Sequence, residues 1–212
     1  MESREIRKPA PGEFAFDISG GALCLDFANT VDNRPQEHPR ELLRGYADLV
    51  AWSRQAGAVS PQQAGQLLRA AARRKAAAQG ALRRARRLRE SLYRIFSAAA
   101  GGRTVPEEDV AALNATAETA LGQLRVRRQG RRFAWDWNEA GPGLERMLWP
   151  VVRSAGELLT SDELGRVREC AAETCGWIFL DRSKNGSRRW CNMKVCGNRA
   201  KARRFYRRRK TA

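Results

Sequence analysis

Cys170-Ala171-Ala172-Glu173-Thr174-Cys175 and Cys191-Asn192-Met193-Lys194-Val195-Cys196 decide the fold of the last fifth of the chain. Cysteines at this spacing can converge on one tetrahedral ion, and Zn²⁺ takes that geometry in structural sites. Two disulfides are the alternative. Because no hydrophobic signal segment opens the sequence, we expect free thiolates in a reducing, cytoplasmic setting. The sequence therefore predicts one structural zinc ion whose ligands are Cys170, Cys175, Cys191 and Cys196.

The ligand set also indicates what the metal does. Four sulfurs close the coordination sphere, whereas a catalytic zinc keeps one position open for water and usually has histidine among its ligands. The only histidine, His38, precedes Pro39 and is expected in a loop. We find no glycine loop for phosphates and no nucleophile-elbow pattern, so we expect the chain not to be an enzyme. The fifth cysteine, Cys24, lies in an apolar stretch and is expected to be a small buried residue.

The distribution of positive charge indicates a polyanionic partner. The 212 residues carry a formal net charge of +17, from 40 Lys and Arg against 23 Asp and Glu. Two segments lack acidic residues: 49–89 contains 10 basic residues, and 182–212 contains 13. The second segment overlaps the predicted metal module, so we expect nucleic acid to bind there. No apolar run reaches the about 20 residues needed to span a bilayer, and we expect no membrane association.

The candidate nucleic-acid contacts are basic residues of the metal module and of the segment that follows it. They are Arg188, Arg189, Lys194, Arg199, Lys201, Arg203, Arg204, Arg207 and Arg208. Such residues neutralise phosphates, although a solvated tail is the plainer alternative. Two interpretations stay open for Asn198 and Arg199, which either bind phosphate or support the loop around the metal. Gly197 is expected to let the backbone approach a ligand sulfur, and the arginines within 83–87 are expected on a solvated helix face.

Hydrophobic periodicity predicts an α+β, mostly helical fold. Helices are expected in six segments: 41–57, 60 onward with a Ser60-Pro61 cap, a longer one through 82–99, 104 onward, 144–159, and 160 to Cys170. Gly101-Gly102 ends the third helix, and Pro150 is a candidate kink in the fifth. A strand is expected from Phe14 to a tight turn at Gly20-Gly21, and residues 22–27 fit either a strand or a short helix.

Period-two alternation beyond Leu121 predicts a β-hairpin packed by the helices. Its apolar positions are Leu124, Val126, Phe133, Trp135 and Trp137. Gly130 is expected in the turn between the two strands. Trp135 and Trp137 are expected in the core rather than on a platform for stacked bases.

A second hairpin is predicted between the two cysteine pairs. Residues 176–180 are expected to form a strand, Asn185-Gly186 a tight turn, and 187–190 the returning strand. A helix that begins at Cys196 follows, so knuckle, hairpin and helix describe a treble-clef-like zinc finger with four cysteine ligands. A module of about 45 residues is too small to fold without its metal. We therefore expect chelation to unfold the module and to leave the rest of the chain folded.

The motifs around the cysteines resemble a known family. Cys175-Gly176-Trp177-Ile178-Phe179-Leu180, Arg189-Trp190-Cys191 and Cys196-Gly197-Asn198-Arg199 are similar to the CGNR zinc finger. Upstream, Leu25-Asp26-Phe27-Ala28-Asn29-Thr30 and Leu158-Leu159-Thr160, together with Leu148-Trp149-Pro150, resemble the ABATE domain that accompanies this finger in bacteria. The resemblance covers nearly the whole chain. We accordingly expect an N-terminal ABATE-like α+β domain at 1–160 and the finger at 161–212.

The resemblance implies a bacterial, stress-induced transcription regulator whose finger contacts nucleic acid. The larger domain would then sense a signal, such as a small-molecule effector, or mediate self-association as a homodimer. Asp26, Asn29 and Thr30 belong to the family-like segment, where they either line a ligand pocket or serve local capping. DNA is the expected partner. An RNA-binding protein and a protein-interaction module with an acidic partner are the alternatives, because charge does not distinguish these polymers.

Overall fold

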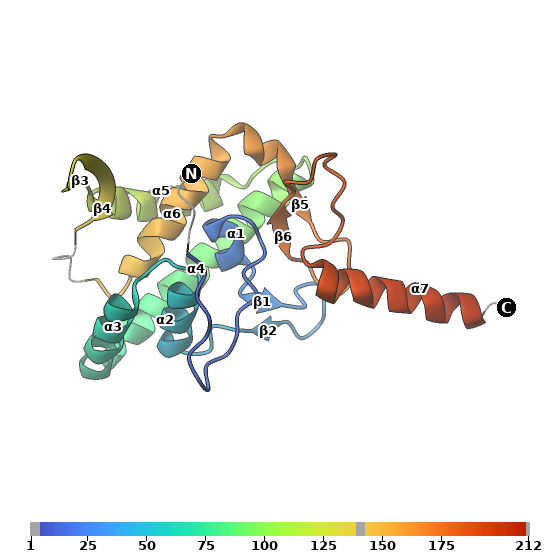
Figure 1. The fold of residues 1–212 in the computed structure, drawn as a ribbon, viewed down its shortest axis with the longest axis horizontal. Helices are drawn as coiled ribbons and strands as arrows, with labels where there is room; N and C mark the ends of the chain where they lie inside the picture. Colours follow the sequence, from blue (N-terminus) through green and yellow to red (C-terminus); the bar gives the residue numbers. More distant parts are fainter. Residues whose placement is uncertain (1–4, 139–142, 211–212) are drawn as a thin grey trace.

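The helix α4 (Lys75–Ala100) lies at the centre of the computed structural model, which describes residues 5–138 and 143–210. The other α-helices of the described chain are α1 (Leu23–Ala28), α2 (Tyr46–Gln55), α3 (Pro61–Arg73), α5 (Glu107–Leu121), α6 (Trp149–Leu159) and α7 (Asn198–Lys210). α4 contacts α1, α2, α3 and α5, while α6 packs against α1 and α5. Figure 1 shows α7 extending away from this helical body.

Small antiparallel sheets complete the described part of the fold. They are β1 (Val31–Asp32) with β2 (Arg40–Glu41), β3 (Leu124–Gln129) with β4 (Arg132–Trp137), and β5 (Val167–Glu169) with β6 (Ile178–Leu180). Shorter helical turns lie at Arg146–Leu148 and Asp162–Arg166, both 3₁₀, and at Met193–Gly197, a π turn. The predicted α+β, mostly helical fold is confirmed. No helix in the described ranges is both long and apolar enough to cross a membrane.

Local signals set the ends of the central helices as the sequence predicts. Ser60 caps α3: its hydroxyl accepts the Gln63 N–H at 3.1 Å, and its own N–H donates to the Gln63 side chain at 2.8 Å. This reciprocal pair is a capping box, with Pro61 at the first helical position. α4 ends at Ala100 with Gly101 as its C-cap, and Gly102 takes a φ of +62°, which favours glycine.

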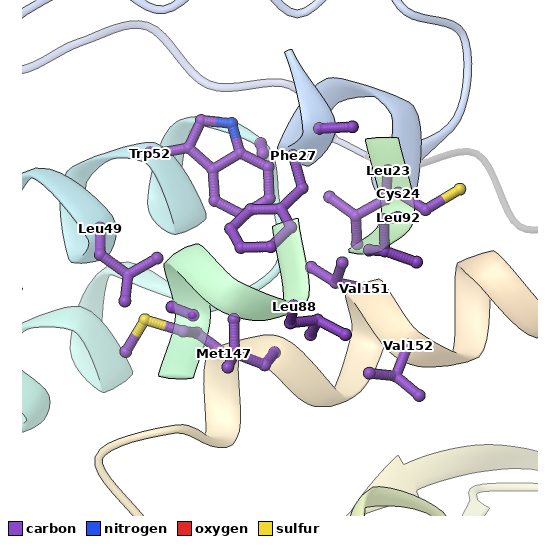
Figure 2. Close-up of a cluster of buried hydrophobic side chains, with 14 of the residues drawn as sticks. Leu23, Cys24, Phe27, Leu49, Trp52, Leu88, Leu92, Met147, Val151 and Val152 are labelled. Carbon is purple, nitrogen blue, oxygen red and sulfur yellow. The ribbon is translucent and has the colours of Figure 1, made fainter. Parts of the chain in front are cut away.

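The main core forms where α1, α2, α4 and α6 meet. Figure 2 shows Phe27 and Trp52 facing each other, with Leu88 of α4 and Val151 of α6 nearby. The Phe27 and Trp52 rings lie 5.0 Å apart, and both side chains are fully buried. The α4 contribution follows the apolar stripe that its sequence predicts. Cys24 is buried beside this cluster, as expected.

The β5–β6 hairpin belongs to the same core as the N-terminal helices. Val167, Ile178 and Leu180 are buried with the residues of α1 and α4 in one continuous cluster. A second, smaller cluster surrounds the cysteines and includes Trp177 and Phe179. Alternate residues of β6 therefore point into different cores, which joins the metal module to the helical body.

Three predictions for the N-terminal half need correction or completion. The predicted strand from Phe14 is absent among the described residues, because this segment is held by side chains such as Gln55, which accepts the Phe16 N–H at 3.1 Å. For residues 22–27 the helical alternative is confirmed, because α1 begins at Leu23 with Ala22 as its N-cap. The helix expected from residue 41 begins at Tyr46, because Arg40 and Glu41 pair with β1.

The C-terminal half departs from prediction at two strands. Residues 167–169 form β5 rather than the end of a helix, because Val167 is drawn into the core opposite Leu180. β6 pairs with β5, so residues 187–190 form no returning strand. The turn at Asn185-Gly186 is present, and Gly186 has a φ of +60°. Pro150 lies in the first turn of α6, where a missing N–H does no harm, so it does not kink the helix.

The β3–β4 hairpin forms in the predicted place, although its aromatic residues divide between core and surface. The turn at Gly130 has a φ of +62°, and Val126 lies opposite Trp135. Trp137 packs on Trp149 with ring centroids 5.8 Å apart, whereas Trp135 is exposed. The prediction of a buried Trp135 is therefore wrong. The predicted break before the next helix includes Gly141 and Pro142, which lie outside the described residues.

Candidate metal centre and nucleic-acid interface

The four predicted ligands converge from two structural elements. Cys170 follows β5 and Cys175 lies in the connection to β6, whereas Cys191 precedes the π turn that leads into α7 and Cys196 lies within that turn. All four Sγ atoms lie within 4.8 Å of one another. The Sγ atoms of Cys175 and Cys191, and those of Cys191 and Cys196, are both 3.6 Å apart.

These distances fit one zinc ion. Sulfurs at about 2.3 Å from a tetrahedral Zn²⁺ lie about 3.8 Å apart, close to the spacing observed here. A disulfide would need sulfurs about 2.05 Å apart, so the thiols are not paired. Three of the four cysteines are buried and Cys175 is partly exposed. His38, the only histidine, has an exposed side chain in a bend and takes no part.

A backbone hydrogen bond supports a thiolate at Cys170. The Cys191 N–H donates to the Cys170 Sγ at 3.5 Å, and backbone N–H groups of this kind stabilise zinc-bound sulfur. Hydrogen bonds from Cys175 and Cys191 lower the pKa of Cys170, and the hydrogen bond with Cys170 raises the pKa of Cys191. A divalent cation would displace the remaining protons. Acid should therefore release the metal, because protons and zinc compete for the same sulfurs.

Gly197 leaves room for neighbouring side chains, whereas the sequence predicts that it lets the backbone approach a ligand sulfur. A Cβ at this position would collide with the Met193 sulfur and would lie 3.2 Å from the Trp190 ring. The Asn198 side chain donates to the Lys194 carbonyl at 3.0 Å, one turn earlier in the chain. Asn198 therefore has a local hydrogen-bond partner, while Arg199 is exposed at the base of α7.

A basic groove runs between the first cysteine loop and α7. It has a volume of about 650 Å³ and is lined by residues of both segments. Its basic lining residues are Arg189, Arg199, Lys201, Arg203, Arg204 and Arg207. Trp190 and Met193 contribute apolar surface, and Glu173 is the acidic member of the lining, 3.3 Å from the Arg203 guanidinium. The structure thus brings six of the nine predicted contacts together.

The other three predicted contacts lie differently. Arg188 lies over the Phe179 ring at 4.5 Å and donates to the backbone carbonyls of Trp190 and Cys191. Its guanidinium supports the loop, so Arg188 belongs to the scaffold and not to the groove. Lys194 is exposed in the π turn. Arg208 is part of α7, and its side chain lies outside the described residues.

Asp26, Asn29 and Thr30 do not line the basic groove, and they are buried and hydrogen-bonded inside the protein. The Asn29 amide donates to the Ile178 carbonyl at 2.7 Å and accepts the Ile178 N–H at 3.0 Å. Asp26 accepts the Gly20 N–H at 2.7 Å, and the Thr30 hydroxyl donates to the Phe27 carbonyl at 2.8 Å. Of the two interpretations left open for these residues, these contacts support hydrogen bonding within the protein: Asn29 joins α1 to β6, and Thr30 bonds within the α1 segment.

Several residues that shape the site carry no strong signal in the sequence. The Asp181 carboxylate accepts the N–H groups of Ser183 and Arg188, both at 2.9 Å, and the hydrogen bonds from Ser183 lower its pKa. The Asn192 side chain caps the π turn by accepting the Lys194 N–H at 3.0 Å. It also donates to Asp17 at 2.8 Å. Only the position of Asn192 directly after a ligand cysteine marks it in the sequence.

Comparison with family models gives two adjacent matches. Residues 21–162 match the ABATE model, described as "Putative stress-induced transcription regulator", and residues 166–209 match the CGNR zinc finger. The four clustered cysteines all fall within the second match. No match was found among curated proteins.

Proposed function

Because the chain belongs to the ABATE family and carries a CGNR zinc finger, we propose that it is a transcription regulator that binds duplex DNA through its basic groove and α7. The proposal places the protein in the cytoplasm, where zinc thiolates stay reduced, and assigns it no catalytic role. Zinc holds the groove in shape. The contacts with phosphate come from the arginines and lysines around it.

The observation that carries the proposal is the composition and placement of α7. Its 13 residues include eight basic residues and no acidic residue. The side chains described from Lys201 to Arg207 are all exposed, and Figure 1 shows the helix standing clear of the body. Arg199 and Arg203, like Arg203 and Arg207, are four positions apart, where like charges repel. A helix without a packed apolar face is supported best by a polyanion that neutralises it.

The proposal is tested by fluorescence anisotropy with the zinc-loaded full chain, a labelled duplex DNA and a structured RNA at matched salt. The triple variant Arg203→Ala, Arg204→Ala, Arg207→Ala should bind DNA at least about tenfold more weakly and lower the salt slope by about three. The control Arg73→Ala, Arg74→Ala, Arg83→Ala removes the same charge from exposed positions on the body. It should change affinity far less.

Wild-type binding should also fall by about a few hundredfold between about 50 and 200 mM salt if five phosphates are contacted. The proposal would be contradicted if DNA affinity did not change with salt concentration. Equal losses of DNA affinity in the two triple variants would also contradict it. Tighter binding to RNA at every salt concentration would favour the RNA-binding alternative. Weak binding to both polymers would favour an acidic protein partner for this face.

A further inference from the structure

The β3–β4 hairpin presents an unusual apolar face to solvent. Val126, Phe133 and Trp135 are 60%, 70% and 56% exposed. The register places Val126 directly opposite Trp135 and Arg128 opposite Phe133, so these side chains share one face of the two-stranded sheet. Exposed aromatic residues gathered on a strand pair are typical of a binding surface.

The opposite face of the same hairpin is cationic. Arg125, Arg127 and Arg132 alternate with the apolar positions and are exposed. Across residues 124–137 there are five arginines and a single acid, Asp136, which pairs with Arg127 at 2.7 Å. A ligand for this hairpin must therefore match an apolar face on one side and positive charge on the other.

The base of the β3–β4 hairpin is held by contacts with neighbouring residues. The outer edge of each strand has no further strand beside it in the described sheet. Trp137 packs on Trp149, and the Asn138 N–H donates to the Gln123 carbonyl at 2.9 Å. The sheet contains only β3 and β4, so each strand has one edge without a partner strand among the described residues. An isolated two-stranded sheet gains stability from a third strand, and free edges accept one readily.

Two other occupants fit less well. A second copy of the chain would bring two hairpins of equal positive charge together, which costs free energy. A duplex bound along α7 would not reach the hairpin by continuing straight along the groove, because Figure 1 shows the two features at opposite ends of the molecule. The hairpin is thus available to a different partner while α7 is occupied.

We propose that the β3–β4 hairpin binds an extended protein segment of alternating apolar and acidic residues, which adds to the sheet as a third strand. Main-chain hydrogen bonds to the free edge would supply part of the affinity. On the β4 edge, apolar side chains of the segment would lie beside Phe133 and Trp135, and its carboxylates would lie beside Arg132 on the other face, with Arg125 one strand further away on that face. This inference does not depend on DNA binding by α7.

The test uses the zinc-loaded full chain and a labelled eight-residue peptide that alternates Val and Glu. The double variant Phe133→Ser, Trp135→Ser should weaken peptide binding at least about tenfold, as loss of central aromatic contacts does. The charge reversal Arg125→Glu, Arg132→Glu should have a similar effect and should restore binding to a peptide that alternates Val and Lys. Leu68→Ser with Val110→Ser removes exposed apolar side chains elsewhere and should leave affinity unchanged.

Backbone pairing is tested with the same Val and Glu peptide methylated at alternate backbone nitrogens, which cannot donate to a strand edge. It should bind at least about tenfold more weakly. Equal binding of the methylated peptide would overturn the third-strand model. Light scattering that shows a dimer lost in the Phe133 and Trp135 variant would assign the face to a second copy instead. Single-stranded DNA that binds and displaces the peptide would assign it to nucleic acid.

Discussion

At the scale of single residues, Asn29 makes the contact that best explains how the two family segments are joined. Its amide pairs with both backbone groups of Ile178, 149 residues away in the chain. Asn29 and Ile178 are both buried, so no water can replace the amide without a local rearrangement. A buried amide that satisfies a strand's N–H and C=O acts as a side-chain substitute for a third strand.

We predict that Asn29→Ala destabilises the protein by about 2–4 kcal/mol, because it leaves two buried backbone groups without a partner. Urea denaturation of the zinc-loaded chain measures the loss. Gln62→Ala, an exposed amide on α3, serves as the control and should fall within about 0.5 kcal/mol of wild type. Equal stabilities for Asn29→Ala and wild type would show that the pair with Ile178 is not needed.

The role of Cys170 can be predicted from the sequence, whereas that of Asn29 cannot. Cysteine spacing within one module carries the ligand geometry, so the four sulfurs can be predicted from a short stretch. Asn29 acts through a strand in the other half of the chain, and nothing near it in the sequence indicates that strand. Its polar neighbours Asp26 and Thr30 bond groups close to them in the chain, Gly20 and Phe27, but polar residue types alone do not distinguish such hydrogen bonds from contacts with a ligand.

At the scale of elements, α5 is tied to α4 by an ion pair at its first turn. The Asp109 carboxylate is buried and accepts the Arg94 Nε–H at 2.7 Å. This hydrogen bond lowers the pKa of Asp109. A carboxyl group whose folded pKa is lowered stabilises the fold above its unfolded pKa, and that contribution is lost as pH falls through the folded pKa.

We therefore predict that Asp109→Asn lowers the free energy of unfolding at pH 7 by about 1–3 kcal/mol, a range limited by the half-exposed Arg94. The difference from wild type should stay constant down to about pH 5 and shrink below about pH 4, where the Asp109 carboxyl group of the unfolded wild type takes up its proton, and it should vanish once folded Asp109 is protonated as well. Urea titrations at each pH measure it. Because both proteins lose zinc in acid, that loss cancels in the comparison. Glu108→Gln, the exposed neighbour, should show no such trend.

Elements with strong local signals are the ones that the sequence predicts well. The Ser60 cap, the apolar stripe of α4 and the Gly130 turn each depend on neighbours a few residues apart. The misassigned segments, which are the predicted strand from Phe14 to the Gly20-Gly21 turn, residues 160–170 and residues 187–190, depend on distant partners instead. Val167, for example, becomes a strand residue because Leu180 lies opposite it, and helix periodicity cannot anticipate that pairing.

At the scale of the whole molecule, the metal module is docked on the helical body and shares its core. The Leu180 N–H donates to the Gly20 carbonyl at 2.8 Å, and the Trp177 indole donates to the Val31 carbonyl at 2.9 Å. Gly176 fits against Arg34 and Pro35, where an added Cβ would lie 3.0 Å from either side chain. The body therefore holds β6 from one side, while zinc holds the loops on its other side.

Because the helical body also holds β6, we expect removal of zinc to unfold only part of the metal module. We predict that a strong chelator at neutral pH releases the cysteine loops and α7, whereas β6 stays folded on the helical body. In hydrogen exchange with and without chelator, the amides of Cys191, Cys196 and Gly197 should lose protection. The amides of Ile178 and Leu180 should keep most of theirs, because their acceptors are Asn29 and Gly20 and not the metal site.

Hydrogen exchange of Asn29→Ala with and without chelator distinguishes the contribution of the helical body to the stability of β6 from that of zinc. With zinc bound, the variant should keep protection at Cys196; without zinc, it should lose protection at Ile178 as well, because neither side then holds the strand. Zinc should also bind the variant more weakly than wild type, since part of the binding free energy must now order β6. Full loss of β6 protection in chelated wild type would show that the metal module folds as an independent unit and that its shared core contributes little.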